Sequence, residues 1–180
     1  MVCNSVTLQS IDARCHRSIG GLKRILIAKR DDVVQPVADE TTGEIATVTL
    51  KSGQKFEQWL FRTNTASYTS TLSSDQAIGN QSVTTEVTLQ FSKAEATKRL
   101  AIQSAINAAA VVILEDMYGQ HIYLGYDEEV YVTAATMVSG TASTDLNGFT
   151  LTFTDVAQEL PHFLAENFNV DALLTATPNA

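Results

Sequence analysis

The sequence predicts a mainly β fold, a β-sandwich or barrel with one flanking α-helix and one long extended β-hairpin. Three observations lead to this prediction. The 180-residue chain contains 22 Thr and 13 Ser, which favour strands and turns over helices. Short apolar or alternating segments are separated by Gly, Asn and Asp turns, as in sandwiches and barrels. A single segment combines a helical apolar face with an N-terminal capping pattern.

The N-terminal part predicts an irregular arm followed by two strands. Residues 1–20 are mixed in polarity and end at a pair of glycines, which interrupt regular structure. Residues 22–28, LKRILIA, carry apolar side chains on both faces and therefore predict a central strand. An acidic, turn-rich loop follows, and residues 45–50 predict a short strand.

Residues 55–92 predict one long antiparallel hairpin. Its first strand begins with the apolar FEQWLF and continues as RTNTASYTSTLSS, which has almost nothing to bury. After a loop around Gly79, VTTEVTLQF returns with a strict alternation of apolar and polar residues. Thirteen extended residues span about 40 Å, whereas typical strands have about five or six residues. The hairpin is therefore either a surface feature without a partner or a strand pair that joins another chain.

Residues 93–109 predict the flanking helix. Ser92 and Glu95 have the spacing of a capping box, in which each side chain accepts from the other residue's backbone N–H. The apolar face of this segment consists mostly of alanine. Because alanine is small, we expect the helix to lie close against a sheet.

Strand-like segments continue after the helix. They are residues 111–117, 121–126, 127–138 and 149–154, with an Asn147-Gly148 turn before the last. No internal repeat or interdomain linker is visible. The expected organisation is an N-terminal arm (1–20), a single β-sandwich domain (21–164) and a C-terminal tail (165–180).

Charge is distributed unevenly along the chain. Residues 1–99 contain all 12 Lys and Arg with 10 acidic residues, a net charge of +2, and residues 100–180 contain 10 acidic residues, a net charge of −10. An acidic surface repels nucleic acid, which argues against groove-type DNA recognition. Neither a membrane-spanning apolar run nor a signal-peptide core is present, so we expect the chain to stay in the compartment where it is made.

The sequence carries no constellation typical of an enzyme. His16, His121 and His162 accompany no nucleophile motif, and no phosphate-binding or dinucleotide-binding glycine pattern occurs. Cys3 and Cys15 lack the spacing of a metal site or a disulfide framework. We therefore expect no catalytic residue, no metal, no cofactor and two reduced thiols.

Polar strands persist when another chain pairs with their edges, and closing them around a ring removes the edges. We therefore expect a cyclic homo-oligomer joined through the hairpin. The expected interface residues are Arg62, Thr63, Asn64, Thr65, Tyr68, Thr69, Thr71, Thr84, Glu86 and Thr88. The residues expected to line a channel that repels phosphate are Glu115, Asp116, Asp127, Glu128 and Glu129. The simpler interpretation of the last three is a solvated strand entry or a subunit contact.

Several segments resemble a known family. They are GGLKRILIAKRDDV, WLFRTNTASYTSTLS with VTTEVTLQFSK, and IYLGYDEEVYVTAATMVSGTASTDLNGFTLTFTD through ELPHFL, together roughly residues 20–164. These segments resemble tail proteins of phages of gut Bacteroidales, including crAss-like phages. The resemblance implies a structural protein of the tail tube type, with a β-sandwich, a flanking helix and an extended hairpin.

The resemblance also implies an assembly. In this assembly, rings of six or twelve copies stack on one another. The inner strands of the rings form a barrel that passes double-stranded DNA without tight binding. It implies contacts with other tail or neck proteins, no membrane association, and a location in the virion tail after synthesis in the host bacterial cytoplasm.

Two other functions remain open at this stage. The chain could be a head–tail connector or neck ring protein of a short-tailed phage. It could also be a monomeric β-sandwich module that binds a small ligand or glycan, with Trp59 and tyrosines as stacking residues. Trp59 lies in the apolar half of its strand, which favours a core position. A glycan-binding screen on a monomeric sample discriminates between these functions.

Overall fold

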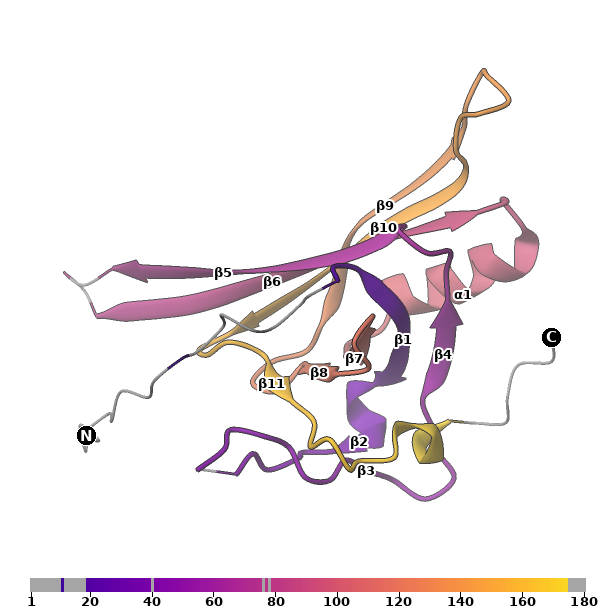
Figure 1. Ribbon diagram of the computed structural model, residues 1–180. Coiled ribbons are helices and arrows are strands. Elements are labelled where there is room, and N and C mark those ends of the chain that lie inside the picture. Colours follow the sequence, from indigo (N-terminus) through magenta and orange to yellow (C-terminus); the bar gives the residue numbers. More distant parts are fainter. Residues whose placement is uncertain (1–10, 12–18, 40, 76, 78, 175–180) are drawn as a thin grey trace.

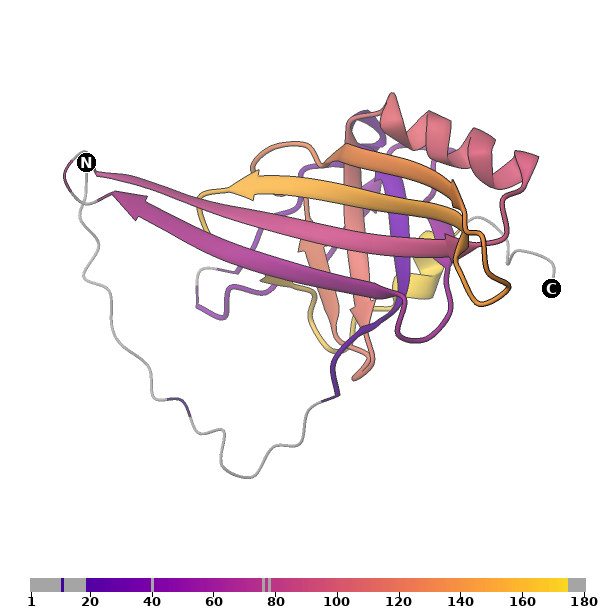
Figure 2. The same ribbon diagram turned by 90° about the horizontal axis from the view of Figure 1, so that it is seen from above.

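The computed structural model describes residues 11, 19–39, 41–75, 77 and 79–174, and the structural statements below concern that part of the chain. Two antiparallel sheets of five and four strands pack face to face, with one α-helix beside them (Figures 1 and 2). The mainly β fold is confirmed. Neither the α-helix nor the short 3-10 helices of the described residues have the length and apolar character that crossing a bilayer requires.

The five-stranded sheet has the order β11-β8-β7-β1-β4, and every neighbouring pair is antiparallel. Its strands are β1 (Leu22–Lys29), β4 (Glu57–Leu60), β7 (Ala110–Asp116), β8 (His121–Leu124) and β11 (His162–Phe163). Both faces of β1 and β7 are largely buried, as their continuous apolar sequences predict.

The four-stranded sheet has the order β5-β6-β10-β9. Its strands are β5 (Ala66–Asp75), β6 (Asn80–Ser92), β9 (Tyr131–Ser139) and β10 (Asn147–Ala157). Figure 2 shows them side by side across the other sheet, with the β5–β6 hairpin extending past the end of β10. The inner strands β6 and β10 bury alternate residues, so one face of this sheet packs on the core.

The main core lies between the two sheets and includes Ile102 and Ala105 of the helix. Trp59 packs against its edge, with ring centroids 5.7 Å from Phe91 and 6.0 Å from Phe153. The predicted core position of Trp59 is therefore met only in part, because the residue is partly buried against the core. Its ring is therefore engaged with other aromatic residues, which weakens its candidacy as a glycan-stacking platform.

A second core covers the other face of the five-stranded sheet. The elements on this side are η1 (Arg30–Asp32), β2 (Val33–Val34), β3 (Thr49–Leu50) and η2 (Val170–Leu173). Val170 and Leu173 are buried, and the Phe56 N–H donates to the Leu173 carbonyl at 2.8 Å. The folded domain therefore extends to Leu174, beyond the expected boundary at residue 164. The predicted N-terminal arm, with Cys3, Cys15 and His16, lies almost entirely outside the described residues.

The helix α1 (Ala96–Ile106) is shorter at both ends than the predicted 93–109. The expected capping box does not form, because Glu95 itself is the extended N-cap residue and its carboxylate pairs with Lys93 and Lys98. Lys93 has a φ of 66°, which interrupts regular backbone just before the helix. The helix lies beside the strands close to β9, but only Ile102 and Ala105 of its residues are buried, so the expected close packing of an alanine face is seen only in part.

The hairpin is also shorter than the predicted 55–92. Residues 57–60 form β4, which pairs with β1 in the five-stranded sheet. The chain then turns at 62–65, where Asn64 has a φ of 65° and Thr65 Oγ1 donates to the Arg62 carbonyl at 2.5 Å. The physical reason is polarity: the apolar FEQWLF segment gains free energy by joining the core, and the polar segment that follows does not. The hairpin proper consists of β5 and β6.

Candidate functional site

Strands β5 and β9 form the two outer edges of the four-stranded sheet, and no described strand pairs with their outer sides. Of the ten residues of β5 only Ala66 is buried, and none of the nine residues of β9 is buried. Both strands are longer than the usual five or six residues. Each open edge presents a row of backbone N–H and C=O groups, which is a template for another strand.

The register shows which backbone groups of β5 point outward. The Gln90 N–H donates to the Thr65 carbonyl at 2.9 Å, immediately before the first ladder pair, Ala66 with Leu89. Hydrogen-bonded and non-hydrogen-bonded pairs alternate along an antiparallel ladder. The residues whose N–H and C=O face the open side are therefore Ala66, Tyr68, Ser70, Leu72 and Ser74.

The same reasoning applies to β9. The Gly140 N–H donates to the Leu146 carbonyl at 3.0 Å, just beyond the last ladder pair, Ser139 with Asn147. Alternation up to the register shift at Thr152 leaves three residues of β9 with backbone groups on the open side. These residues are Ala135, Met137 and Ser139.

Large apolar side chains are exposed on both edges. Leu72 is 55% exposed and Tyr68 38% exposed on β5, and Met137 is 65% exposed on β9. Leu72 pairs with the buried Val83, and Met137 pairs with the buried Phe149. Cross-strand partners point to the same face, so all three side chains lie on the core side of the sheet without being covered.

The opposite face of the sheet is lined by hydroxyl groups, and we call it the hydroxyl face. On β6, β9 and β10 it includes Thr84, Glu86, Thr88, Gln90, Thr133, Thr136, Thr150, Thr152 and Thr154. The Thr133 and Thr154 hydroxyls hydrogen bond across the strands at 2.8 Å. None of the four strands contains Lys or Arg, and their charged residues are Asp75, Glu86 and Asp155.

The residues predicted at the subunit interface fall into three groups. Arg62, Thr63, Asn64 and Thr65 lie in and around the turn that precedes β5. Tyr68, Thr69 and Thr71 lie on the outer strand β5. Thr84, Glu86 and Thr88 lie on β6, which is an inner strand, so they belong to the hydroxyl face and not to an edge.

The structure does not bring the five predicted channel acids together on the four-stranded sheet. Glu115 lies on β7, is 3% exposed, and pairs with Lys23 at 2.5 Å and with Arg24. Burial alone would raise the pKa of Glu115, but hydrogen bonds from the two cations outweigh it and lower that pKa. The expectation that Glu115 lines a channel is wrong, because its charge is neutralised inside the molecule.

The other four acids lie in connections. Asp116 Oδ1 accepts hydrogen bonds from the Tyr118 and Gln120 backbone at 2.8 and 2.9 Å, which stabilises the turn between β7 and β8. The other three, Asp127, Glu128 and Glu129, lie between β8 and β9. Their placement agrees with the simpler interpretation of a polar strand entry, and a channel position for them stays a prediction.

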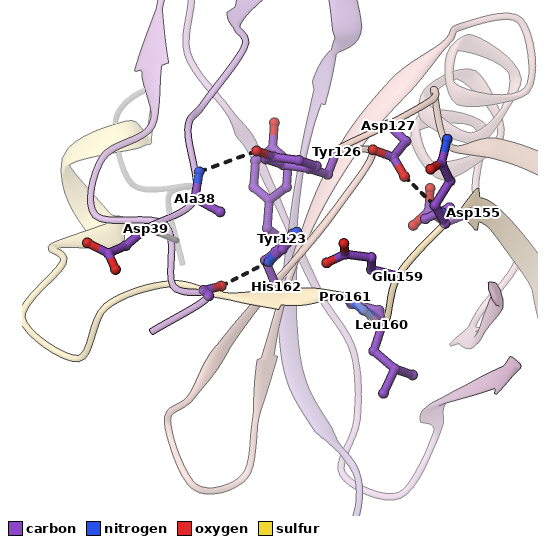
Figure 3. A pocket seen from close by; sticks show the side chains of 13 residues that line it. Ala38, Asp39, Tyr123, Tyr126, Asp127, Asp155, Glu159, Leu160, Pro161 and His162 are labelled. Atoms are coloured by element: carbon purple, nitrogen blue, oxygen red, sulfur yellow. Dashed lines mark hydrogen bonds between the residues drawn. The ribbon is translucent and has the colours of Figure 1, made fainter. Parts of the chain in front are cut away.

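A polar cavity of about 520 Å³ opens between the ends of the sheets (Figure 3). It is lined by residues of β8, β10, β11 and nearby loops, including Tyr123, Tyr126, Asp155, Glu159 and His162. Sequence reasoning missed this site. The alternation in FTLTFTDV could have predicted a buried carboxylate, because it places Asp155 on the same face as the core aromatics of β10.

The comparisons with known proteins add no relative to this description. No family model, curated protein or solved structure matches the chain. Among the described residues, no group of three or more His, Cys, Asp or Glu side chains is arranged to hold a metal ion.

Proposed function

We propose that the protein is a non-enzymatic structural subunit of a phage tail tube or tail ring, in which β5 of one copy pairs with β9 of the next. The observation that carries this proposal is the pair of long, exposed and open edges on one sheet. Joining several such sheets into a closed barrel would satisfy the outward-facing backbone groups of both edges at once. The family resemblance of residues 20–164 supports the tail as the location of this assembly.

The direction of the strands is compatible with a ring. The four strands are antiparallel throughout, so β5 and β9 run in opposite directions. A copy related by rotation about the ring axis would therefore place its β5 antiparallel to β9 of its neighbour. An interface of this kind is head-to-tail, uses two different surfaces of each copy, and closes when the rotation completes a circle.

The exposed apolar side chains support the same pairing. Leu72 and Tyr68 on β5 and Met137 on β9 lie on the core side of the sheet. Continuing the sheet across the interface would place a neighbouring strand beside each of these residues and remove apolar surface from water. Burial of apolar surface contributes about 25 cal/mol per Å², which adds to the backbone hydrogen bonds.

In the proposed barrel the hydroxyl face is the lining of the channel, and this placement supports DNA passage. Its strands carry no Lys or Arg that could hold phosphate groups, and Glu86 and Asp75 add two negative charges per copy. Affinity for DNA depends mainly on cations that contact phosphate. Double-stranded DNA would therefore slide through such a channel without dwelling.

The test is the native mass of the purified chain, with negative-stain images of the same sample at low and high ionic strength. We expect closed rings with a fixed number of copies that persist at high salt, because backbone hydrogen bonds and apolar contacts are little screened. Stacked rings support a tail tube, and single rings support the connector or neck ring. Open or variable aggregates, or a protein that is monomeric at every concentration, contradict the proposal.

A further inference from the structure

Asp155 is a buried carboxylate with an incomplete set of partners. It lies on the core side of β10, is 3% exposed, and lines the polar cavity. The Gly125 backbone N–H donates to the carboxylate, but Oδ1 has no hydrogen-bond partner. Gly125 has a φ of +92°, and a Cβ there would lie 3.3 Å from the Ala110 carbonyl, so the chain approaches closely at this point. Leaving a buried acceptor unpaired is costly.

A second unpaired group lines the same cavity. Tyr123 on β8 is 1% exposed, and its hydroxyl has no hydrogen-bond partner. Burial raises the pKa of Tyr123 to about 12, so the hydroxyl stays neutral and can both donate and accept. The neutral phenol adds no charge to the cavity wall, so the carboxylates determine the charge that the cavity presents.

The charge of the cavity selects the sign of that ligand. Asp39, Asp127 and Glu159 line it together with Asp155, and no lining residue is Lys or Arg (Figure 3). Two of these carboxylates use one oxygen to accept backbone N–H groups, Asp39 Oδ1 from Thr41 and Thr42, and Asp127 Oδ2 from Gln158. Four acids around one cavity with no lining Lys or Arg favour a cation.

The walls of the cavity select an organic cation. The rings of Tyr126 and His162 lie side by side, with centroids 4.5 Å apart, and both line the cavity. His162 Nδ1 lies 2.9 Å from the Gly43 carbonyl, and the Tyr126 hydroxyl accepts from the Ala38 N–H at 3.3 Å, so both rings are fixed. Aromatic faces attract organic cations, whereas no three acidic, His or Cys side chains of the described residues are arranged to hold a bare metal ion.

We propose that this cavity is a binding site for an ammonium or guanidinium group carried on an apolar stem. The cationic head pairs with the Asp155 carboxylate, and the stem lies against the rings of Tyr126 and His162. Arg30 lies close enough to act on Tyr123, but its guanidinium is bonded to Gln35 and does not line the cavity. The site does not depend on the proposed ring, because neither β5 nor β9 contributes to it.

The test is a titration of the full-length, 15N-labelled chain with n-butylguanidinium and n-butylammonium, followed by NMR at the Gly125 amide. We expect saturable shifts with both cations and none with the neutral analogue n-butylurea. The isosteric variant Asp155→Asn should weaken binding at least tenfold. Glu166→Gln, an exposed carboxylate outside the cavity, is the matched control and should bind as the unmodified chain does.

A second variant guards against a folding defect. Glu159 is exposed at the cavity, so Glu159→Gln should keep the NMR spectrum of the folded chain and weaken binding severalfold. The proposal is overturned by shifts that do not saturate, by equal shifts with n-butylurea, or by unchanged affinity in Asp155→Asn and Glu159→Gln.

Sedimentation of the same samples distinguishes two sources of the cation, a side chain of a second copy and a free small molecule. If Asp155→Asn and an excess of n-butylguanidinium both reduce self-association, the natural ligand is a Lys or Arg side chain of a second copy. If self-association is unchanged while n-butylguanidinium binding is lost in the variant, the ligand is a free amine or guanidine. Both results support the site, and ring formation itself is scored separately by native mass.

Discussion

Leu72 and Met137 lie on opposite edges of one sheet, on its core side, and both are more than half exposed. Each stands beside a buried partner, Val83 for Leu72 and Phe149 for Met137. The apolar layer of the sandwich therefore continues to both rims of the sheet and stops there uncovered. A second copy of the same sheet would cover both rims, which is the basis of the proposed ring.

Replacing Met137 with Gln should weaken ring formation. The substitution puts an amide where the proposed interface buries a thioether, and we expect the concentration at half assembly to rise about tenfold, roughly 1.4 kcal/mol. Analytical ultracentrifugation measures the concentration at half assembly. Val37→Gln alters another exposed apolar residue, away from the four-stranded sheet, and should assemble normally. Equal effects of the two substitutions would show that Met137 does not lie in the interface.

Proline at Ala135 should block assembly without unfolding the domain. The Ala135 N–H faces the open edge, so a proline there loses no hydrogen bond within the sheet. The neighbouring Ala134→Pro removes an N–H that alternation places in the β9–β10 ladder, and it should lower the melting temperature instead. Melting curves and native mass on both variants check this pair. An Ala135→Pro variant that still forms rings would contradict pairing through β9.

A positive charge on the hydroxyl face should make the channel retain DNA. Glu86→Lys places one cation per copy where the four strands have none. We expect assembled Glu86→Lys to bind double-stranded DNA with strong salt dependence, and the unmodified assembly to bind it weakly. Glu166→Lys makes the same charge change outside this sheet. Gel-shift assays across a salt series compare them, and equal retention by both variants would place the hydroxyl face outside the channel.

Asp155→Asn should stabilise the domain at neutral pH. Burial, with the negative charges of Asp127 and Glu128, raises the pKa of Asp155 from 3.8 to about 6, although the Gly125 N–H opposes the shift. The folded state then holds the proton more tightly than the unfolded state. The free energy of unfolding of the unmodified chain therefore begins to fall as the pH rises past 3.8, and the full loss is reached above pH 6. Chemical denaturation should show that Asp155→Asn has a free energy of unfolding higher than that of the unmodified chain by on the order of 1–3 kcal/mol above pH 6. This difference should vanish near pH 4. A gain independent of pH would show that ionisation is not its cause.

Sequence patterns predicted the elements whose faces differ in polarity. The strict alternation from Val83 to Phe91 correctly predicted the buried face of β6, and the continuous apolar run of β7 correctly predicted a buried strand. The polar segment after Arg62 correctly indicated a long strand with little to bury. These predictions hold because the burial of apolar side chains is the main driving force of folding and its pattern is local in sequence.

Other features depend on contacts that sequence does not reveal. The apolar start of the predicted hairpin joined β1 instead, because a partner strand across the core was available. Glu115 was mistaken for a surface acid, since its cations come from β1, more than ninety residues earlier. The cavity escaped notice because its lining residues come from β8, β10, β11 and loops that are far apart in the sequence.

Amide hydrogen exchange at increasing protein concentration, with native mass on the same samples, tests the central claim most directly. As rings form, we expect protection to appear on the outer strands together, at Tyr68, Ser70 and Leu72 of β5 and at Ala135 and Met137 of β9. The protected amides should be those that point away from the ladders already present in the monomer. Rings whose β5 and β9 amides keep exchanging as fast as in the monomer would contradict the account.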